Sequence, residues 1–513
     1  MTFVPVANRG LIMASIMVAA FITNLDSTIA NIALPQIQGS LSAASEEITW
    51  VLTSYIIAVA IMTPMSGWLA GRFGRKRVLL VSIAGFTLMS AACGLATDLP
   101  QMVLFRTLQG MFGASLAPIS QSLVFDMNPP EKHGQAMATW GSAILVSPML
   151  GPVIGGFITE HLSWRWVFLI NLPLGILAFA GVWLFMRGMR DPPRRRFDFV
   201  GYGALAAAIA SLQLILDRGP GQDWFNSLEI WVIAAAGVIS TWVFVTHTLT
   251  TAHPFFSPAL ARQRNFITCA FFAFFCNMMM FSTLTLLPPL TQNLMGYPVL
   301  LGGLVTMPRG LTSCVTMFIV GQFIARYDVR RFLMLGLALC AFAFWDMSQY
   351  SLEMGWESFA LAAAIQGLAL GMVNTPLSTI GLGTTPMAIR GEATAIYHLV
   401  RNLGASVGIA VMHSMVITNT AASYASIGGQ VDPSTPAMAA ALGSTYNPAA
   451  VEGLIRLSEQ VHREAAMVAY VNVFRLMMCI ALICIPFLLF LRGRDHMGRE
   501  ETLSPAKPDG EGL

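Results

Sequence analysis

The run Ala204-Leu-Ala-Ala-Ala-Ile-Ala-Ser-Leu-Gln-Leu-Ile-Leu216 indicates the class of fold that this chain adopts. It is apolar throughout and lacks the two-residue alternation of a β-barrel strand. Apolar runs of about 18 or more residues, separated by short polar loops, recur along the chain. A hydrocarbon core about 30 Å thick needs about 20 helical residues to cross it. Since lipid cannot satisfy bare backbone groups, these runs predict membrane-spanning helices.

The composition excludes several classes of protein. Of 513 residues, 55% are hydrophobic and 11% are charged, whereas a soluble domain carries about 25% charged residues. The chain has no basic block patterned for nucleic acid and no GxxxxGK[ST] nucleotide motif, so ATP-driven pumping is not expected. Its seven cysteines lie in apolar runs without metal-ligand spacing. We therefore expect an integral membrane protein that is not an enzyme and has no metal or cofactor.

The apolar runs predict fourteen spans, an all-α polytopic fold. They lie near residues 11–34, 48–70, 78–97, 101–125, 136–158, 166–187, 199–216, 228–247, 266–290, 300–324, 332–350, 359–381, 393–420 and 467–491. An even number of spans puts both termini on one side of the membrane. Most of the 29 lysine and arginine residues then fall in segments on the same side as the termini. The positive-inside rule therefore predicts that both termini are cytoplasmic.

An internal repeat divides the chain. Gly67 to Arg72 is echoed by Gly321 to Arg326, and Gln109-Gly110 is echoed by Gln366-Gly367. The four residues from His133 are echoed by the four from Arg390 at nearly the same offset. Such a parallel repeat is typical of a transporter with two six-helix halves. The predicted organisation is 6 + 2 + 6: an N-terminal half (1–190), two inserted helices with linkers (191–260), a C-terminal half (261–495) with a long outer loop (421–466), and a disordered cytoplasmic tail (496–513).

Two charges within spans are candidates for proton coupling. A charge within a span costs at least about 2.5–3.5 kcal/mol on insertion scales. Asp26 in span 1 and Arg106 in span 4 lie at comparable depth. We expect both to face a central cavity, where Asp26 exchanges protons and Arg106 tunes its proton affinity. The alternative is a static polar lock that holds the two spans in register.

A second group of residues is a candidate conformational latch at the cytoplasmic face. The glycines allow close helix approach, and Asp126, at the end of span 4, is a candidate partner for the arginines. The alternative for the arginines is ordinary anchoring on the positive side of the membrane. The group consists of Gly67, Arg72, Gly74, Arg75, Asp126 and Arg326.

Two further sets concern helix packing and the substrate cavity. Proline and glycine crowd span 5, where they bend a helix and allow tight packing: Pro148, Gly151, Pro152, Gly155 and Gly156. Polar residues within the spans are candidates for lining a substrate cavity: Asn24, Asn31, Gln109, Asn277, Arg309 and Arg401.

Five motifs in order carry a family resemblance: Leu25-Asp-Ser-Thr-Ile-Ala-Asn-Ile-Ala-Leu-Pro35, Gly67 to Arg77, Arg106-Thr-Leu-Gln-Gly110, Gly151-Pro-Val-Ile-Gly-Gly156 and Ser163-Trp-Arg-Trp-Val-Phe-Leu-Ile-Asn-Leu-Pro173. Together they resemble the fourteen-span drug/proton antiporters of the major facilitator superfamily, the EmrB/QacA-like group and especially its EmrB-like members. The span 5 run resembles the antiporter motif. One departure is Gly71, which stands where the family's loop motif usually has an acid.

The resemblance implies proton-coupled multidrug efflux of hydrophobic or amphipathic compounds across a bacterial inner membrane, by alternating access. It also implies a periplasmic membrane-fusion adaptor and an outer-membrane channel as partners, with the outer loop as a docking element; an ordered cap without a partner is the alternative. Within the same fold, a narrow-specificity metabolite exporter or a proton-coupled importer remains open. A receptor or scaffold would need a large soluble domain, which the sequence does not contain.

Overall fold

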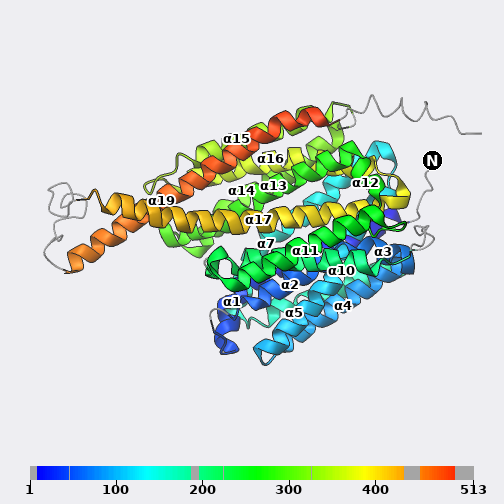
Figure 1. Cartoon of the computed structure of the whole chain (residues 1–513), viewed down its shortest axis with the longest axis horizontal. Helices are drawn as coiled ribbons and strands as arrows, with labels where there is room; N and C mark the ends of the chain where they lie inside the picture. The colour runs from blue at the N-terminus through cyan, green and yellow to red at the C-terminus, as the bar shows by residue number, and fades with distance from the viewer. Residues whose placement is uncertain are drawn as a thin grey trace, which may run out of the picture.

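The computed structural model describes residues 8–44, 47–186, 196–222, 224–324, 326–431 and 451–491, which form helices and connecting turns without a strand (Figure 1). The side chain of Pro152 lies outside this description, as do the predicted boundary at 190/191, the tail 496–513 and residues 432–450 of the outer loop.

The first half of the chain forms the expected helices, two of them broken. A bend of 58° separates α2 from α3 at the Thr63-Pro64 break, and a two-residue break separates α5 from α6. The elements are α1 (Arg9–Ser40), α2 (Trp50–Met62), α3 (Met65–Phe73), α4 (Arg75–Leu95), α5 (Leu99–Gly113), α6 (Leu116–Asp126), η1 (Pro130–Lys132), α7 (His133–His161), α8 (Trp166–Leu169) and α9 (Asn171–Phe185).

The inserted pair is a helical hairpin of α10 (Phe199–Arg218) and α11 (Leu228–Thr250), joined by η2 (Pro220–Gln222) and η3 (Trp224–Asn226). Asp198 closes the end of the hairpin opposite η2 and η3, because its carboxylate accepts hydrogen bonds from the backbone N–H groups of Gly201 at 2.9 Å and Phe255 at 3.1 Å. The same carboxylate lies 2.9 Å from His247 Nε2 on α11. Most apolar side chains of α11 are exposed, which suits a helix that faces lipid.

The second half contains the longest helices. Its elements are α12 (Pro258–Arg262), α13 (Arg264–Pro288), η4 (Pro289–Leu294), α14 (Val299–Phe323), α15 (Val329–Met347), α16 (Trp356–Gly383), α17 (Met387–Gly428), α19 (Val451–Cys484) and η5 (Ile485–Phe490).

Eleven helices in the described part of the chain are long and apolar enough to cross a membrane, or twelve if α2 and α3 form one bent span. The all-helical polytopic fold is therefore confirmed. The α5/α6 segment and α15 lie outside this set. Helices α5 and α6 are individually short, with 15 and 11 residues, and α15 carries Arg330, Arg331 and Asp346.

The two halves meet along α7 and α14 and around α17. A Cβ atom placed on Gly134 of α7 would lie 2.9 Å from the carbonyl oxygen of Gly321 on α14. Only glycine allows the two backbones to approach this closely. On the other side of the interface, α17 contacts α3 and α6 of the first half.

The described parts of the predicted outer segment 421–466 are helical at both of its ends. Helix α17 continues to Gly428, and α19 starts at Val451, so both project beyond the other helices (Figure 1). Leu457 and Val461 of α19 pack against Ile427, which continues the apolar contact outside the bundle. Apolar residues at helical spacing extend each helix past the hydrocarbon region, because the two extensions bury one another.

Candidate functional site

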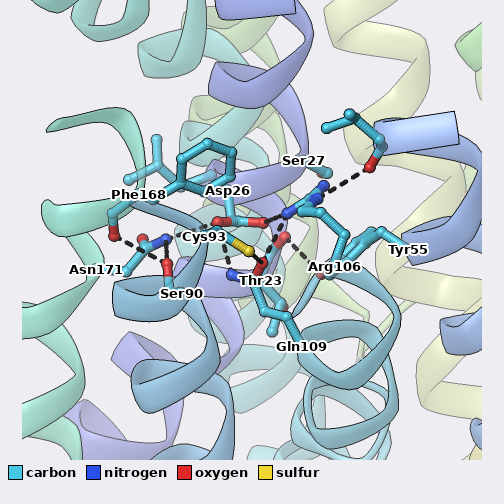
Figure 2. A network of polar contacts seen from close by, with 12 residues as sticks. Thr23, Asp26, Ser27, Tyr55, Ser90, Cys93, Arg106, Gln109, Phe168 and Asn171 are labelled. Carbon is cyan, nitrogen blue, oxygen red and sulfur yellow. Dashed lines mark hydrogen bonds and ion pairs between the residues drawn. The ribbon is translucent and has the colours of Figure 1, made fainter. Parts of the chain in front are cut away.

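Asp26 is the centre of a buried polar network (Figure 2). Its side chain on α1 is 1% exposed. One carboxylate oxygen accepts a hydrogen bond from Arg106 Nη1 at 2.6 Å. The other oxygen accepts from Gln109 Nε2 at 2.9 Å and from Asn171 Nδ2 at 2.7 Å. Three donors that converge on one carboxylate replace the water that its burial removes.

Arg106 neutralises this charge from α5 and is itself fully buried. Its Nε donates to the carbonyl oxygen of Val51 at 3.0 Å, and its Nη1 also donates to Gln109 Oε1 at 2.9 Å. The guanidinium carbon lies 4.2 Å from the centre of the Tyr55 ring, a cation–π contact. The arginine thus replaces most of its lost hydration with protein partners.

Asn171 extends the network to two further helices. It is the first residue of α9 and is fully buried. Its Nδ2 also donates to Ser90 Oγ on α4 at 2.9 Å, and Ser90 Oγ donates to the carbonyl oxygen of Phe168 at 2.8 Å. Asn171 was not predicted as a site residue, although it lies inside the Ser163–Pro173 motif.

The expectation that Asp26 and Arg106 face a central cavity is wrong in this structure. Both are enclosed within the first half, with partners on α2, α4, α5 and α9. The ion pair and its hydrogen bonds make the burial of two opposite charges tolerable, whereas an open cavity would hydrate them. Two atoms of the network, Arg106 Nη2 and Asn171 Oδ1, lack a hydrogen-bond partner among the described residues.

Two predicted latch residues, Arg75 and Asp126, come together at one end of the bundle with one residue that was not predicted. Asp126 at the end of α6 forms ion pairs with Arg75 of α4 and with Arg390 of α17. Arg390 was not predicted as a latch residue. The internal repeat nevertheless aligns the four residues that start at Arg390 with the four that start at His133. Arg72 and Arg326 are exposed instead.

The structure explains why glycine is needed at both glycine positions of the predicted latch. A Cβ atom on Gly67 would lie 3.0 Å from the backbone of Gly391 and Glu392, so α3 and α17 touch through bare backbone. Gly74 separates α3 from α4 with a φ of 89°, a conformation that favours glycine.

The span 5 glycines differ in what they contact. A Cβ atom on Gly151 would lie 2.7 Å from Thr28 Cβ on α1, and one on Gly155 would lie 3.2 Å from Ile29 Cγ2. A Cβ atom on Gly156 would meet nothing within 4 Å. Pro148 is half-buried within α7, which continues as a helix through it. Two of the three glycines thus pack α7 against the helix that carries Asp26.

The structure separates the six predicted cavity residues. Arg401 lines a pocket between the halves, whose walls include Gln121 and Trp140 on one side and Asn374 and Tyr397 on the other. Its Nη2 donates to Asn277 Oδ1 at 3.3 Å.

The other four lie elsewhere. Gln109 belongs to the Asp26 network, and Arg309 Nη2 donates to the carbonyl oxygen of Met280 at 2.9 Å. Asn24 Nδ2 donates to the carbonyl oxygen of Ala20 at 3.0 Å, and Asn31 is exposed.

Comparison with known proteins identifies the family. Residues 16–409 match the sequence profile of the Major Facilitator Superfamily. The chain belongs to the major facilitator superfamily. Within this superfamily, it is 34% identical over 420 residues to the multidrug export protein EmrB of Escherichia coli K12, an alignment that covers 82% of each chain. The predicted EmrB-like resemblance is thereby confirmed.

Other superfamily members agree with this placement. The chain is 34% identical to EmrB of Haemophilus influenzae, over 85% of this chain and 86% of the other. It is 33% identical to the fatty acid resistance protein FarB of Neisseria gonorrhoeae, over 78% and 79%. The superfamily fold also appears in the crystal structure of the human organic anion transporter MFSD10, with a TM-score of 0.61 and 13% identity over 92% of this chain and 99% of the other. The protein is a multi-pass inner-membrane protein of a transporter family.

Proposed function

We propose that this superfamily member is an efflux pump that exports hydrophobic and amphipathic compounds across the inner membrane in exchange for protons. The observation that carries the proposal is its similarity to EmrB over 82% of both chains. The buried Asp26–Arg106 pair supports the proton-coupled part, because ionisable residues inside membrane-spanning helices are rare and mark proton relays and substrate pathways.

The coupling follows from the pairing. Ionised Asp26 holds α1 to α5 and α9 through its three hydrogen bonds. A proton on the carboxylate cancels its charge and weakens the attraction to Arg106. The helices of the first half then hold together less tightly, and the two halves are free to rock between access states. If Asp26 and Arg106 form only a static polar lock, protonation of Asp26 is not a step of the transport cycle.

Substitution of Asp26 tests the proposed function. Asp26→Asn removes the titrating group but retains an amide of similar size, so substrate efflux driven by an imposed pH gradient should fall by roughly tenfold or more. Everted membrane vesicles with a fluorescent hydrophobic cation report this directly. The matched control is Asp346→Asn, a half-buried carboxylate on α15. Undiminished proton-driven efflux by Asp26→Asn would contradict the coupling.

The topology is proposed as fourteen spans in a 6 + 2 + 6 arrangement, with the division at residues 190 and 260. The α5/α6 segment and α15 supply the two spans beyond the twelve that length and composition support. Figure 1 places the start of α1 and the end of α19 at the same end of the bundle, which agrees with termini on one side. The arginine-rich segments place that side in the cytoplasm.

The substrate pocket is proposed to include Arg401. This arginine contributes a positive charge to a pocket that both halves line, and it donates hydrogen bonds to the neutral amide of Asn277. A substrate carboxylate would complete the charge pairing. FarB is named for fatty acid resistance, and we infer that amphipathic acids are among the compounds that this pump accepts.

The latch is proposed to hold the inner face closed. Asp126 connects the first half to α17 through Arg390, beside the Gly67 contact. Both contacts must break before the inner ends of the halves separate.

Projecting α17 and α19 are proposed as the docking element for a periplasmic adaptor that leads to an outer-membrane channel. Val451 and Ile455 near the start of α19 are 74% and 51% exposed. These apolar side chains lie beyond the bundle, where a partner helix can cover them.

A further inference from the structure

Asn171 carries a buried, unused acceptor beside the proposed proton site. Its Nδ2 donates to Asp26 Oδ1 and to Ser90 Oγ, whereas its Oδ1 has no partner among the described residues. A buried carbonyl oxygen without a donor costs about 1–3 kcal/mol. Such an atom calls for an explanation at a site whose other polar atoms, apart from Arg106 Nη2, are paired (Figure 2).

The two protonation states of Asp26 need opposite partners. Ionised Asp26 only accepts hydrogen bonds, whereas protonated Asp26 also has one O–H to donate. A proton on the oxygen that faces Arg106 would point at a cation that cannot accept it. The proton therefore belongs on the other oxygen, Oδ1, which faces the amides of Gln109 and Asn171.

Only one of these amides has an acceptor free to receive the proton's hydrogen bond. Gln109 Oε1 already accepts from Arg106 Nη1 at 2.9 Å and from Cys93 Sγ at 3.7 Å. Asn171 Oδ1 accepts nothing in the described structure. Rotation of the Asn171 amide about its Cβ–Cγ bond exchanges the two ends, so Oδ1 then faces Asp26 and Nδ2 gives up its hydrogen bond to Ser90 Oγ.

We propose that Asn171 is the positioning residue that pairs with Asp26 in both protonation states. Its Nδ2 donates to the carboxylate, and after protonation its Oδ1 accepts the new O–H of Asp26. Asp26 gains a proton and nothing else in this step. The proton comes from the water from which the pump takes up its protons. This inference rests on the proposed proton coupling at Asp26 and adds the residue that stabilises each state of it.

The other groups around Asp26 leave this role to Asn171. Facing side chains with a charge or a titratable proton are Arg106 on α5, Tyr55 on α2 and Cys93 on α4 (Figure 2). Helices α6 and α7 also pack on α1, and their charged or titratable residues lie at their ends: Asp126, His133, Glu160 and His161.

Infrared pH titration of the purified full-length protein tests the proposal. The carbonyl band of the protonated carboxylic acid grows as Asp26 takes up its proton, and its loss in Asp26→Asn assigns it. Asn171→Leu removes both donor and acceptor, and the ionised state loses the stronger, charge-assisted bond. We therefore expect the midpoint of the Asp26 titration to rise by about 0.7 pH unit. The carbonyl band should also move to higher wavenumber, since its O–H has lost an acceptor.

Two further variants complete the test. Asn171→Asp has the same shape but places a second carboxylate beside Asp26, so its midpoint should rise more than that of Asn171→Leu. Gln213→Leu, a buried amide on α10 that donates to Ser406 Oγ at 3.1 Å, should leave the midpoint unchanged.

The outcomes are distinguishable. An unchanged midpoint and band in both Asn171 variants, with the Asp26 band present, would overturn the role of Asn171 while leaving Asp26 as the proton site. A merely structural Asn171 would lower the melting temperature without moving the midpoint. The absence of any titrating band that Asp26→Asn removes would instead refute the proposed function.

Discussion

A buried carboxylate is stable inside a membrane protein only while its charge is matched. Asp26 is matched by one guanidinium and two amides, which come from two other helices. The sequence predicted that Asp26 and Arg106 act together because two costly charges lie at similar depth in spans 1 and 4. Asn171 escaped the same reasoning because a neutral amide carries no charge that marks it within the Ser163–Pro173 motif.

At the same scale, the charge of Arg401 should decide which substrates are exported. Arg401→Met removes the positive charge from the pocket between the halves, so efflux of an amphipathic acid such as decanoate should fall by roughly tenfold or more. A quaternary ammonium cation needs no such partner, and its efflux should persist. Transport assays of both compounds in vesicles measure the ratio of acid efflux to cation efflux.

Two variants control this comparison. Arg401→Lys retains the charge and should retain part of the acid transport. Arg475→Met removes an exposed arginine from α19 and should change the efflux of neither substrate. Equal loss of acid and cation transport in Arg401→Met would show that the arginine supports folding or the cycle, not selectivity.

Within single elements, the glycines of α7 have unequal roles despite their shared motif. Only the tertiary structure distinguishes them, because sequence spacing cannot say which glycine faces another backbone. Gly151 and Gly155 pack on α1, whereas Gly156 faces open space. The contact at Gly151 also lies two residues along α1 from Asp26, which connects the motif to the proton site.

This difference predicts opposite outcomes for two alanine substitutions. Gly151→Ala would place a methyl group within 2.7 Å of Thr28 Cβ, so it should destabilise the protein by about 1–3 kcal/mol. Gly156→Ala adds a methyl group where nothing lies within 4 Å, so it should change stability by less than about 0.5 kcal/mol. Thermal unfolding in detergent compares the two, and equal melting temperatures would contradict the packing role.

For the whole molecule, the proposed latch depends on an acid that contacts both halves. Asp126 belongs to the first half by sequence and contacts Arg75 there, but Arg390 reaches it from α17. Beside this pair, Gly67 lets α3 touch the backbone of α17. The chain lacks the usual acid at Gly71, and Asp126 supplies the negative charge for these arginines.

Loss of Arg390 should loosen this latch. Arg390→Gln leaves the Arg75–Asp126 pair intact but removes the ion pair between the halves, so the inner ends should open more often. We expect roughly tenfold faster hydrogen exchange in peptides covering 65–75 and 387–398. Arg262→Gln, at an exposed arginine of α12, is the control. Unchanged exchange in Arg390→Gln would show that the ion pair does not hold the inner face closed.

The sequence by itself determined that the chain is an all-helical membrane protein, because apolar runs long enough to cross a bilayer leave no other way to satisfy the backbone. It also determined the family, since ordered motifs persist where backbones must touch or charges must pair. Only the tertiary structure decided that Asp26 is sealed inside the first half, that Asn171 and Arg390 belong with the charged residues, and that α17 and α19 continue outside the bundle. The physical reason is that hydrogen bonds and ion pairs join residues far apart in the chain, and hydropathy along the sequence carries no information about which of them meet.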